Sequence, residues 1–508
     1  MEILDQYKVE KDGLVADIKI IRDPQKFVLQ YNITVPEINP AISAIFNDIR
    51  TDLIRNYPEK VDEFSKDLNN QKLRLEFLNE INKRVSSYLP GYDESKIKAY
   101  SAMLLHQMFG IGKLEIITAD ENLEEIVANK SKSPVFVYHK KFGWLESNVK
   151  IDSEEEIYSY AQSIGRQVGR QITTLSPLMD AQLPSGDRVN ATLSPISIQG
   201  NTLDIRKFRA EPWTFIDFIK NQTLTTEIVA TLWEGLQYEM SIIVTGGTAS
   251  GKTSMLNVLM PLMPPNQRII TIEDTHELVL PKFMHWVPLL TRPPNNEGKG
   301  EISMLDLLVN SLRMRPDRIV VGEVRRKEEV ETLFEGLMTG HAVYATIHSD
   351  TAQQVIKRLL SAPIELPEIE LSAMDLILTA FRQRRTGIRR LREIAEIAET
   401  YSVGKMEIKA NNIFEWNSRT DKIERTTNPS LKFYSKIYSY TGLSQKEIDD
   451  EINEKKKVIE WMLRKNVNGV DDLGYIIATY YIDKNSVLNI VEKDSDPQLL
   501  LSQYGKQN

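Results

Sequence analysis

Short apolar runs alternate with helix-like apolar spacing between about residues 225 and 400. Buried-type strands are predicted at 241–245, 268–273 and 318–323, and a helix is predicted over 252–262. Because strands that alternate with helices usually pair in parallel, this region is expected to form an α/β domain with a mostly parallel sheet.

The N-terminal half of the chain shows other patterns. Residues 1–95 open with short mixed segments and then show helix-like spacing over 61–89. Residues 96–210 are expected to form an α+β domain with helices at 96–108 and 154–168, strands at 135–139 and 144–149, and a loop-rich run up to residue 208. Residues 211–224 are predicted to be a hinge or linker, because strand-like spacing gives way there to a Pro-marked connection.

The C-terminal region, residues 401–508, is predicted to start with a hairpin and then to become helical. The hairpin is expected to turn at Asn411-Asn412. Ser444 and Glu447 form a capping box at the start of a helix with one apolar face. This extension is expected to pack against the α/β domain, and no chemistry is predicted for it.

The composition restricts the class of protein. The chain has 508 residues, 41% of them hydrophobic, which is enough to bury cores in roughly two to four domains. It has no Cys, which excludes disulfides and Cys-based zinc sites. No signal peptide and no apolar run of about 18 residues is found, so a membrane role is expected to require a partner. The net charge of −8 argues against a generic nucleic-acid binder.

A phosphate-binding loop connects the strand at 241–245 to the helix that follows. Lys252 is expected to reach the β- and γ-phosphates of ATP, and the Thr253 hydroxyl to bind Mg²⁺. The positive end of the helix points at the same anion. The alternative is an ordinary Gly-rich turn, which the flanking strand and helix disfavour. The predicted nucleotide-binding residues of the loop are Gly246, Gly247, Thr248, Ala249, Ser250, Gly251, Lys252, Thr253 and Ser254.

Two acidic residues follow predicted strands in the order that an ATPase requires. Glu273 ends the strand at 268–273, and a carboxylate beside the phosphate loop is suited to activate water. Glu323 ends another buried-type strand and is expected to hold Mg²⁺ or its water shell. An acid at the tip of a buried strand also occurs by chance, but the phosphate loop favours the functional interpretation.

Four segments form an ordered set: Gly246–Thr253, Thr271–Glu277, the strand that ends at Glu323, and the pair Thr339–His341 and Ala345–His348. Together they resemble the type II/IV secretion ATPase superfamily, most strongly over about residues 105–400. Residues 291–302 and 312–325 are most similar to the ATPases of Tad pili and their archaeal relatives. Residues 183–190 and 204–208 resemble the N-terminal signature of the family, with Ser-Gly-Asp where Asp-Gly-Ser is usual.

The resemblance implies a RecA-like P-loop ATPase core with an α+β N-terminal domain and a helical C-terminal extension. It assigns Glu273 as the catalytic glutamate and Glu323 as the glutamate associated with Mg²⁺. His341 and His348 match a histidine box that contacts the γ-phosphate. The alternative for both histidines is a buried structural role.

The resemblance also assigns arginines. Arg188 and Arg206 match arginines that reach a nucleotide at a subunit interface, the usual place of an arginine finger. The alternative for both is a structural salt bridge within the N-terminal domain. Arg325 is a weaker candidate. The arginine-rich segment 381–392 is interpreted as a solvated hairpin rather than a nucleic-acid patch.

Two further histidines, His276 and His285, match no required position of the family. They are interpreted as surface or packing residues.

By resemblance, the protein is expected to be a ring-forming ATPase motor, a homo-hexamer that uses ATP and Mg²⁺. It would couple hydrolysis to assembly of a type IV pilus-like filament, or to secretion, through a polytopic membrane platform protein. It is expected in the cytoplasm, peripheral at the inner face of the cell membrane through that partner, without membrane insertion or bound nucleic acid. The alternatives are an archaellum motor, a nucleic-acid translocating ring ATPase and a nucleotide-gated scaffold without turnover.

Overall fold

The computed structural model describes residues 1–66, 70–208, 212–294, 298–383, 385–402, 405–430 and 432–504. The chain divides into two compact units, Met1–Arg209 and Ala210–Asn508. Several predicted features reach beyond the described residues: Leu68 of the helical stretch, Glu211 of the hinge, residues 295–297 of the segment similar to Tad-pilus ATPases, and Arg384 of the arginine-rich segment.

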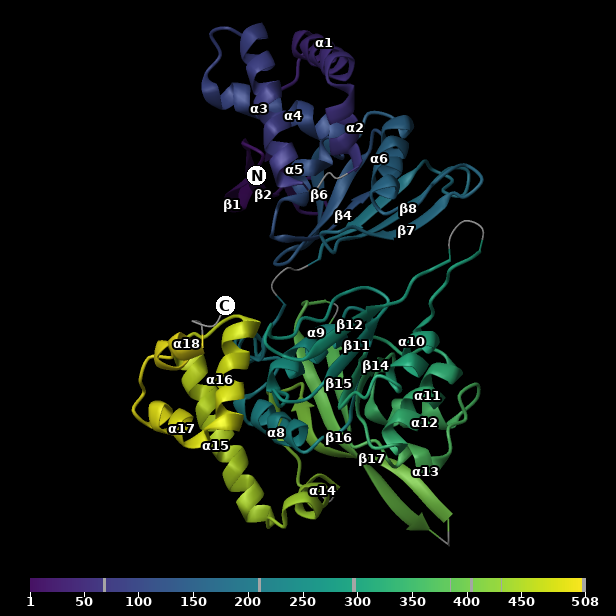
Figure 1. The fold of residues 1–508 in the computed structure, drawn as a ribbon, viewed down its shortest axis with the longest axis vertical. Coiled ribbons are helices and arrows are strands. Elements are labelled where there is room, and N and C mark those ends of the chain that lie inside the picture. The colour runs from purple at the N-terminus through teal and green to yellow at the C-terminus, as the bar shows by residue number, and fades with distance from the viewer. Residues whose placement is uncertain are drawn as a thin grey trace. The chain divides into compact units, whose positions relative to one another are not determined.

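The first unit contains a nine-stranded sheet and six helices among its described residues (Figure 1). The strand order is β1-β2-β3-β6-β5-β4-β9-β8-β7, and all neighbours are antiparallel except β3 and β6. The elements are β1 (Glu2–Lys11), β2 (Leu14–Arg22), β3 (Gln30–Thr34), α1 (Pro40–Asn56), α2 (Pro58–Lys66), α3 (Gln71–Tyr88), α4 (Glu94–Phe109), α5 (Leu114–Thr118), β4 (Leu123–Ala128), β5 (Pro134–His139), β6 (Gly143–Lys150), α6 (Glu154–Gln167), β7 (Leu178–Gln182), β8 (Arg188–Thr192) and β9 (Thr202–Arg206).

The run up to residue 208 was expected to be rich in loops, and loops make up most of it, but the strands within it were not predicted. Three strands, β7, β8 and β9, form there, with buried and exposed positions in alternation. Their inward positions include the small residues Ala181 and Ala191, which weaken the apolar signal in the sequence. The sheet therefore extends to residue 206, and β8 and β9 carry the two arginines singled out above.

The second unit is built on another nine-stranded sheet, in the order β12-β11-β13-β14-β10-β15-β16-β17-β18. The six strands from β12 to β15 in this order are parallel, as predicted, and the last three are antiparallel. The elements are α7 (Phe215–Lys220), α8 (Thr226–Gln237), β10 (Ile242–Gly246), α9 (Lys252–Leu259), a 3₁₀ turn (Met260–Leu262), β11 (Ile269–Glu273), β12 (Trp286–Leu290), α10 (Met304–Ser311), β13 (Arg318–Val321), α11 (Lys327–Met338), β14 (Ala342–Ile347), α12 (Ala352–Leu360), α13 (Glu368–Leu371), β15 (Leu376–Arg382), β16 (Arg389–Ser402), β17 (Lys405–Asn417), β18 (Lys422–Arg425), α14 (Lys432–Thr441), α15 (Gln445–Arg464), α16 (Val470–Ile482), α17 (Lys484–Glu492) and α18 (Gln498–Tyr504).

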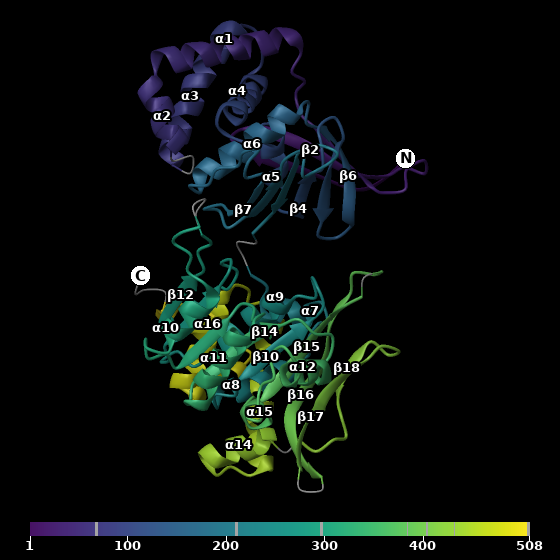
Figure 2. The same ribbon diagram turned by 90° about the vertical axis from the view of Figure 1, so that its right-hand side faces the viewer.

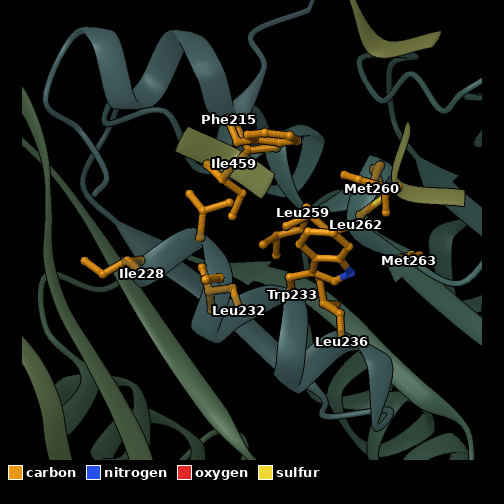
Figure 3. Close-up of a cluster of buried hydrophobic side chains, with 14 of the residues drawn as sticks. Phe215, Ile228, Leu232, Trp233, Leu236, Leu259, Met260, Leu262, Met263 and Ile459 are labelled. Atoms are coloured by element: carbon orange, nitrogen blue, oxygen red, sulfur yellow. The ribbon is translucent and has the colours of Figure 1, made fainter. Parts of the chain in front are cut away.

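Helices cover both faces of the second sheet, so the central strands β10, β11, β13 and β14 are buried along their whole length. Figure 1 shows α10–α13 on one face and α15–α18 on the other. The second unit has two hydrophobic cores, one on each face of the sheet. In the larger core, Trp233 of α8 lies among Leu259, Met260 and Ile459 (Figure 3). The sheet is thereby held rigidly enough to carry a site at its edge.

The C-terminal extension packs on this core, as predicted from the apolar face of its main helix. The capping box at Ser444 and Glu447 is present, and Ile448, Ile452 and Ile459 are buried. A fully buried ion pair joins Lys455 of α15 to Glu234 of α8. Removing one partner of such a pair would leave a buried charge unpaired, so α15 is fixed in place on α8.

The predicted hairpin turn at Asn411-Asn412 is wrong. Both residues lie inside β17, which pairs with β16 and β18 at the edge of the sheet (Figure 2). The amide of Asn411 donates to Glu396 and that of Asn412 to Glu393, at 2.8 and 3.1 Å. Asparagine favours turns by satisfying its own backbone, but here partners on the neighbouring strand satisfy the side chains.

The predicted hinge at 211–224 contains helix α7. Thr214 and Asp217 form a capping box, and Phe215, Ile216 and Phe218 are buried in the core of the second unit. The helix is thus a fixed part of this unit rather than a linker.

None of the helices in the described parts of the chain is long and apolar enough to cross a membrane.

Candidate functional site

The phosphate loop lies at the carboxyl ends of the parallel strands, between β10 and α9. Gly246 is required there, because a Cβ at this position would lie 2.2 Å from the carbonyl oxygen of Ala380. Gly251 has a φ of 94° and caps the start of α9. The Ser250 hydroxyl is buried and has no hydrogen-bond partner among the described residues. A tight backbone turn, an unused hydroxyl and a helix N-terminus together fit a phosphate group.

Lys252, the first residue of α9, folds back over the loop. Its Nζ donates to the carbonyl oxygens of Gly246 and Gly247 at 3.3 and 3.4 Å, and lies 3.1 Å from Nδ1 of His348. Burial lowers the pKa of Lys252, and the charge of Glu323 opposes this shift. The ammonium group therefore lies against the backbone of the loop, in contacts that a bound phosphate could replace.

Glu273 ends β11 and is buried, with 2% of its surface exposed. Its Oε1 accepts hydrogen bonds from the backbone N–H groups of Glu277 and Leu278 at 2.9 and 3.0 Å. The register of the sheet places the end of β11 next to β13, which carries Glu323 just beyond its end. One carboxylate oxygen is thus fixed by the backbone, whereas no backbone hydrogen bond holds the other, Oε2.

Asn257 of α9 holds the segment that contacts Glu273. Its Oδ1 accepts from the N–H of Val279 at 2.8 Å, and its Nδ2 donates to the carbonyl oxygen of Glu277 at 2.9 Å. The helix of the phosphate loop therefore positions the carboxylate of Glu273 through this segment. Asn257 was not predicted as a site residue, although a buried polar residue on an apolar helix face signals a specific hydrogen bond.

Glu323 lies at the centre of a charged network. Its Oε1 is 3.0 Å from Nε2 of His348, and its Oε2 accepts from Arg325 at 2.8 Å. Arg325 also lies 3.4 Å from Asp274. Burial opposes ionisation of Glu323, but the hydrogen bond from Arg325 and the nearby positive charges lower the pKa of the carboxyl below its usual range. The group is thus ionised at neutral pH and suited to hold a divalent cation.

His348 connects the phosphate loop to Glu323. Burial and the charge of Lys252 lower its pKa, so the ring is neutral near pH 7. The tautomer with the proton on Nε2 satisfies both contacts, because Nδ1 then accepts from Lys252 and Nε2 donates to Glu323. His348 therefore contacts both the lysine of the phosphate loop and the acid that is expected to hold Mg²⁺.

His341, the other histidine of the predicted box, lies elsewhere. It precedes β14 and bonds the carbonyl oxygen of Gly336, at the end of α11, at 2.9 Å. In the pairing of β10 with β14, Thr245 lies beside Ile347, so the phosphate loop is at the His348 end of β14. At about 3.3 Å per residue, His341 is roughly 23 Å from His348 along the strand. The two histidines are not brought together, and the fold does not place His341 at the phosphate loop of this chain.

Arg188 and Arg206 belong to the first unit. They lie directly opposite each other on β8 and β9, and they line one pocket together with Glu125, Asp180, Asn190 and Asp204. Burial and the charge of Asp204 raise the pKa of Glu125 to about 7. The two arginines thus share one face of the sheet, in a pocket that carboxylates also line.

The loop residues and the two acids fit ATP with Mg²⁺. Lys252 and the backbone of the loop would hold the phosphates, while Thr253, the second residue of α9, and Glu323 would hold the cation. The metal would neutralise charge on the phosphates. Among the described residues no cluster of three or more His, Cys, Asp or Glu forms a separate metal site.

We expect Glu323→Gln to raise the Mg²⁺ concentration needed for half-maximal ATP turnover, because an amide attracts a divalent cation less than a carboxylate does. Turnover measured against Mg²⁺ concentration checks this. Glu328→Gln, a change of an exposed acid in the first turn of α11, is the matched control. If Glu323→Gln eliminated turnover while metal affinity stayed the same, Glu323 would act as the base instead.

Comparisons with known proteins identify the family of this chain. The family model described as type II/IV secretion system protein matches residues 112–407, more than half of the chain. An uncharacterized protein of Methanocaldococcus jannaschii is 33% identical over 384 residues, which are 75% of this chain and 69% of that protein. The type IV secretion system protein PtlH of Bordetella pertussis is 26% identical over 303 residues, 53% of this chain and 88% of that protein.

Among solved structures, the VirB11 ATPase of the Brucella suis type IV secretion system is similar at 24% identity. The match covers 54% of this chain and 92% of that chain, with a TM-score of 0.28. The parallel sheet with a phosphate loop after β10 makes the second unit a RecA-like P-loop core. The extent of the family match, which includes every loop and acid residue described above, shows that the chain belongs to the type II/IV secretion system protein family.

Proposed function

We propose that this protein is an ATPase motor that couples ATP hydrolysis to assembly of a type IV pilus-like filament or to secretion. One observation carries the proposal: the phosphate loop, Glu273 and Glu323 meet at one edge of a parallel sheet within the family match. A fixed carboxylate for the attacking water, an ionised acid for Mg²⁺ and a lysine for the phosphates are the parts that phosphoryl transfer to water needs.

The proposed motor is a homo-hexameric ring. Arg188 and Arg206 lie in the first unit, whereas the phosphate loop lies in the second. In the proposed ring these arginines complete the nucleotide site of a neighbouring subunit and stabilise charge on the transferring phosphoryl group. ATP then drives motion only through a difference in affinity between open and closed arrangements of the units. Because α7 is packed in the second unit, such motion would occur before Phe215 in the chain.

The proposed partner is a polytopic membrane platform protein at the inner face of the cell membrane, with the motor peripheral to it. Membership of the type II/IV secretion family and the name of the Bordetella relative support a role at a secretion or pilus machine.

The proposal predicts that the purified chain stays with the soluble fraction in flotation with protein-free liposomes, and floats when a platform protein is reconstituted.

Two arginines of the hairpin between β15 and β16 are held by contacts within the chain. Arg390 is bidentate to Asp421 at 2.7 and 2.8 Å, and Arg392 lies over the ring of Phe381 at 4.2 Å. Side chains held in this way contribute to the edge of the sheet and are less available to phosphates of a nucleic acid. Stimulation of ATP turnover by single-stranded DNA would instead favour a translocating ring.

Subunit mixing tests the ring. A protein with Arg188→Ala and Arg206→Ala, and a second protein with Lys252→Ala, are each expected to lose turnover. Mixed oligomers of the two are expected to regain part of it, because one type of interface then contains an intact loop and intact arginines. Phosphate release is measured after mixing, with oligomers verified by native mass spectrometry. Mixed rings without any recovery would indicate a site built within one chain.

A further inference from the structure

His276 lies beside the oxygen of Glu273 that the backbone does not hold. Its Nδ1 is 3.4 Å from Oε2 of Glu273, three residues along the chain. Oε1 of the same carboxylate is occupied by the two backbone N–H groups described above. In a site without nucleotide, catalytic hydrogen bonds are commonly long and tighten on binding. His276 therefore contacts the proposed base at its reactive oxygen.

The imidazole of His276 is held on its other side by Trp286. The two rings stack with centroids 5.7 Å apart and planes 25° apart. Trp286 is itself fixed, because its Nε1 donates to the hydroxyl of Thr271 on β11 at 2.9 Å. The side chain of His276 is 37% exposed. The ring is thus oriented toward Glu273 and also has access to solvent.

We propose that His276 is a positioning residue for Glu273 that also accepts the proton Glu273 takes from the attacking water. This inference rests on the proposed ATPase function. When the water oxygen bonds to the γ-phosphorus, the bond from that phosphorus to the bridging oxygen breaks, and one water proton passes to Oε2 of Glu273. This proton moves to Nδ1 of His276, whose neutral ring carries its own proton on Nε2, and the Nε2 proton then leaves to solvent. Proton exchange with solvent returns the ring to the form with its proton on Nε2, so that Nδ1 can accept again. Glu273 is then ionised for the next turnover.

The electrostatics of His276 agree with this role. The hydrogen bond to Glu273 raises the pKa of His276 above its ordinary value, and partial burial opposes the shift. Among the described residues, Glu273 is the charged group that shifts this pKa, and β12 contributes the uncharged ring of Trp286. His276 accepts a proton only in its neutral form. Turnover should therefore increase as the pH rises through this raised pKa.

Two variants separate positioning from proton transfer. His276→Ala removes both, and we expect kcat to fall roughly tenfold, less than the loss caused by changing the base itself, with nucleotide affinity unchanged. His276→Asn keeps an amide near Oε2, so it should retain more activity than His276→Ala. In neither variant should the pH profile of turnover show an ionisation above the ordinary pKa of histidine. The control is His285→Ala, which removes an exposed imidazole in the same region.

A second measurement does not depend on turnover. In full-length protein with labelled histidine rings, NMR titration should show a raised pKa for His276 that returns to the ordinary value in Glu273→Gln. The proposal is overturned if this titration is the same in both proteins, or if His276→Ala keeps the wild-type kcat and pH profile while Glu273→Gln is inactive. Failure of the ATPase proposal would look different. The wild-type protein would not hydrolyse ATP, but the pKa of His276 would still change in Glu273→Gln.

Discussion

ATP turnover is expected to fall by about 10³-fold, to background, when Lys252 is replaced by Ala. The ammonium group is the positive charge of the loop, and it contacts the carbonyl oxygens of Gly246 and Gly247. Its contacts with Gly246, Gly247 and His348 are long, so their loss should leave the fold intact. Phosphate release and circular dichroism, measured side by side on the same preparation, check both parts of this prediction.

The matched control is Lys282→Ala, which removes an exposed lysine paired with Asp471. This variant should keep full turnover. Near-normal turnover in folded Lys252→Ala protein would contradict the assignment of the phosphate loop.

Replacing Glu273 by Gln is expected to slow turnover by roughly 10²- to 10⁴-fold while Mg²⁺-ATP still binds. The amide oxygen can continue to accept from the N–H groups of Glu277 and Leu278, so the side chain should keep its position. An amide does not accept the proton of the attacking water, and this loss of basicity is what the variant isolates. Single-turnover hydrolysis and binding of a fluorescent nucleotide separate the two effects.

Glu277→Gln provides the control, since it changes a carboxyl in the same segment and keeps the backbone N–H that contacts Glu273. A mild effect of Glu273→Gln, together with complete loss in Glu323→Gln, would exchange the roles of the two acids.

Local sequence was sufficient for the phosphate loop and for the central strands. A loop with glycines at Gly246 and Gly251 depends on backbone freedom within a few residues, and a strand buried on both faces needs an uninterrupted apolar run. The order of loop, Glu273 and Glu323 then implied a shared site, because parallel strands bring their carboxyl ends to one edge. The capping box at Ser444 was predictable for the same local reason.

Predictions failed where the outcome depended on partners far away in the sequence. Asn411 and Asn412 resemble turn residues by type, but carboxylates on β16 bind their amides within the sheet. The strands β7, β8 and β9 have short runs with small inward residues, and pairing with β4 makes them part of a sheet. The stability of such strands comes from pairing with residues far away in the sequence, so the apolar pattern within each strand is weak.

The sequence by itself determined which residues have side chains suited to bind phosphate, hold a cation and activate water, because this suitability follows from residue type and the order of strands. Only the tertiary structure decided which of the histidines lie close to the phosphate loop and the two acids. His341 and His348 are separated by the full length of β14, whereas His276 turns back onto Glu273 and stacks on Trp286. The physical reason is that the register of the sheet and the path of a loop set side-chain distances, and neither is encoded in the local pattern of residues.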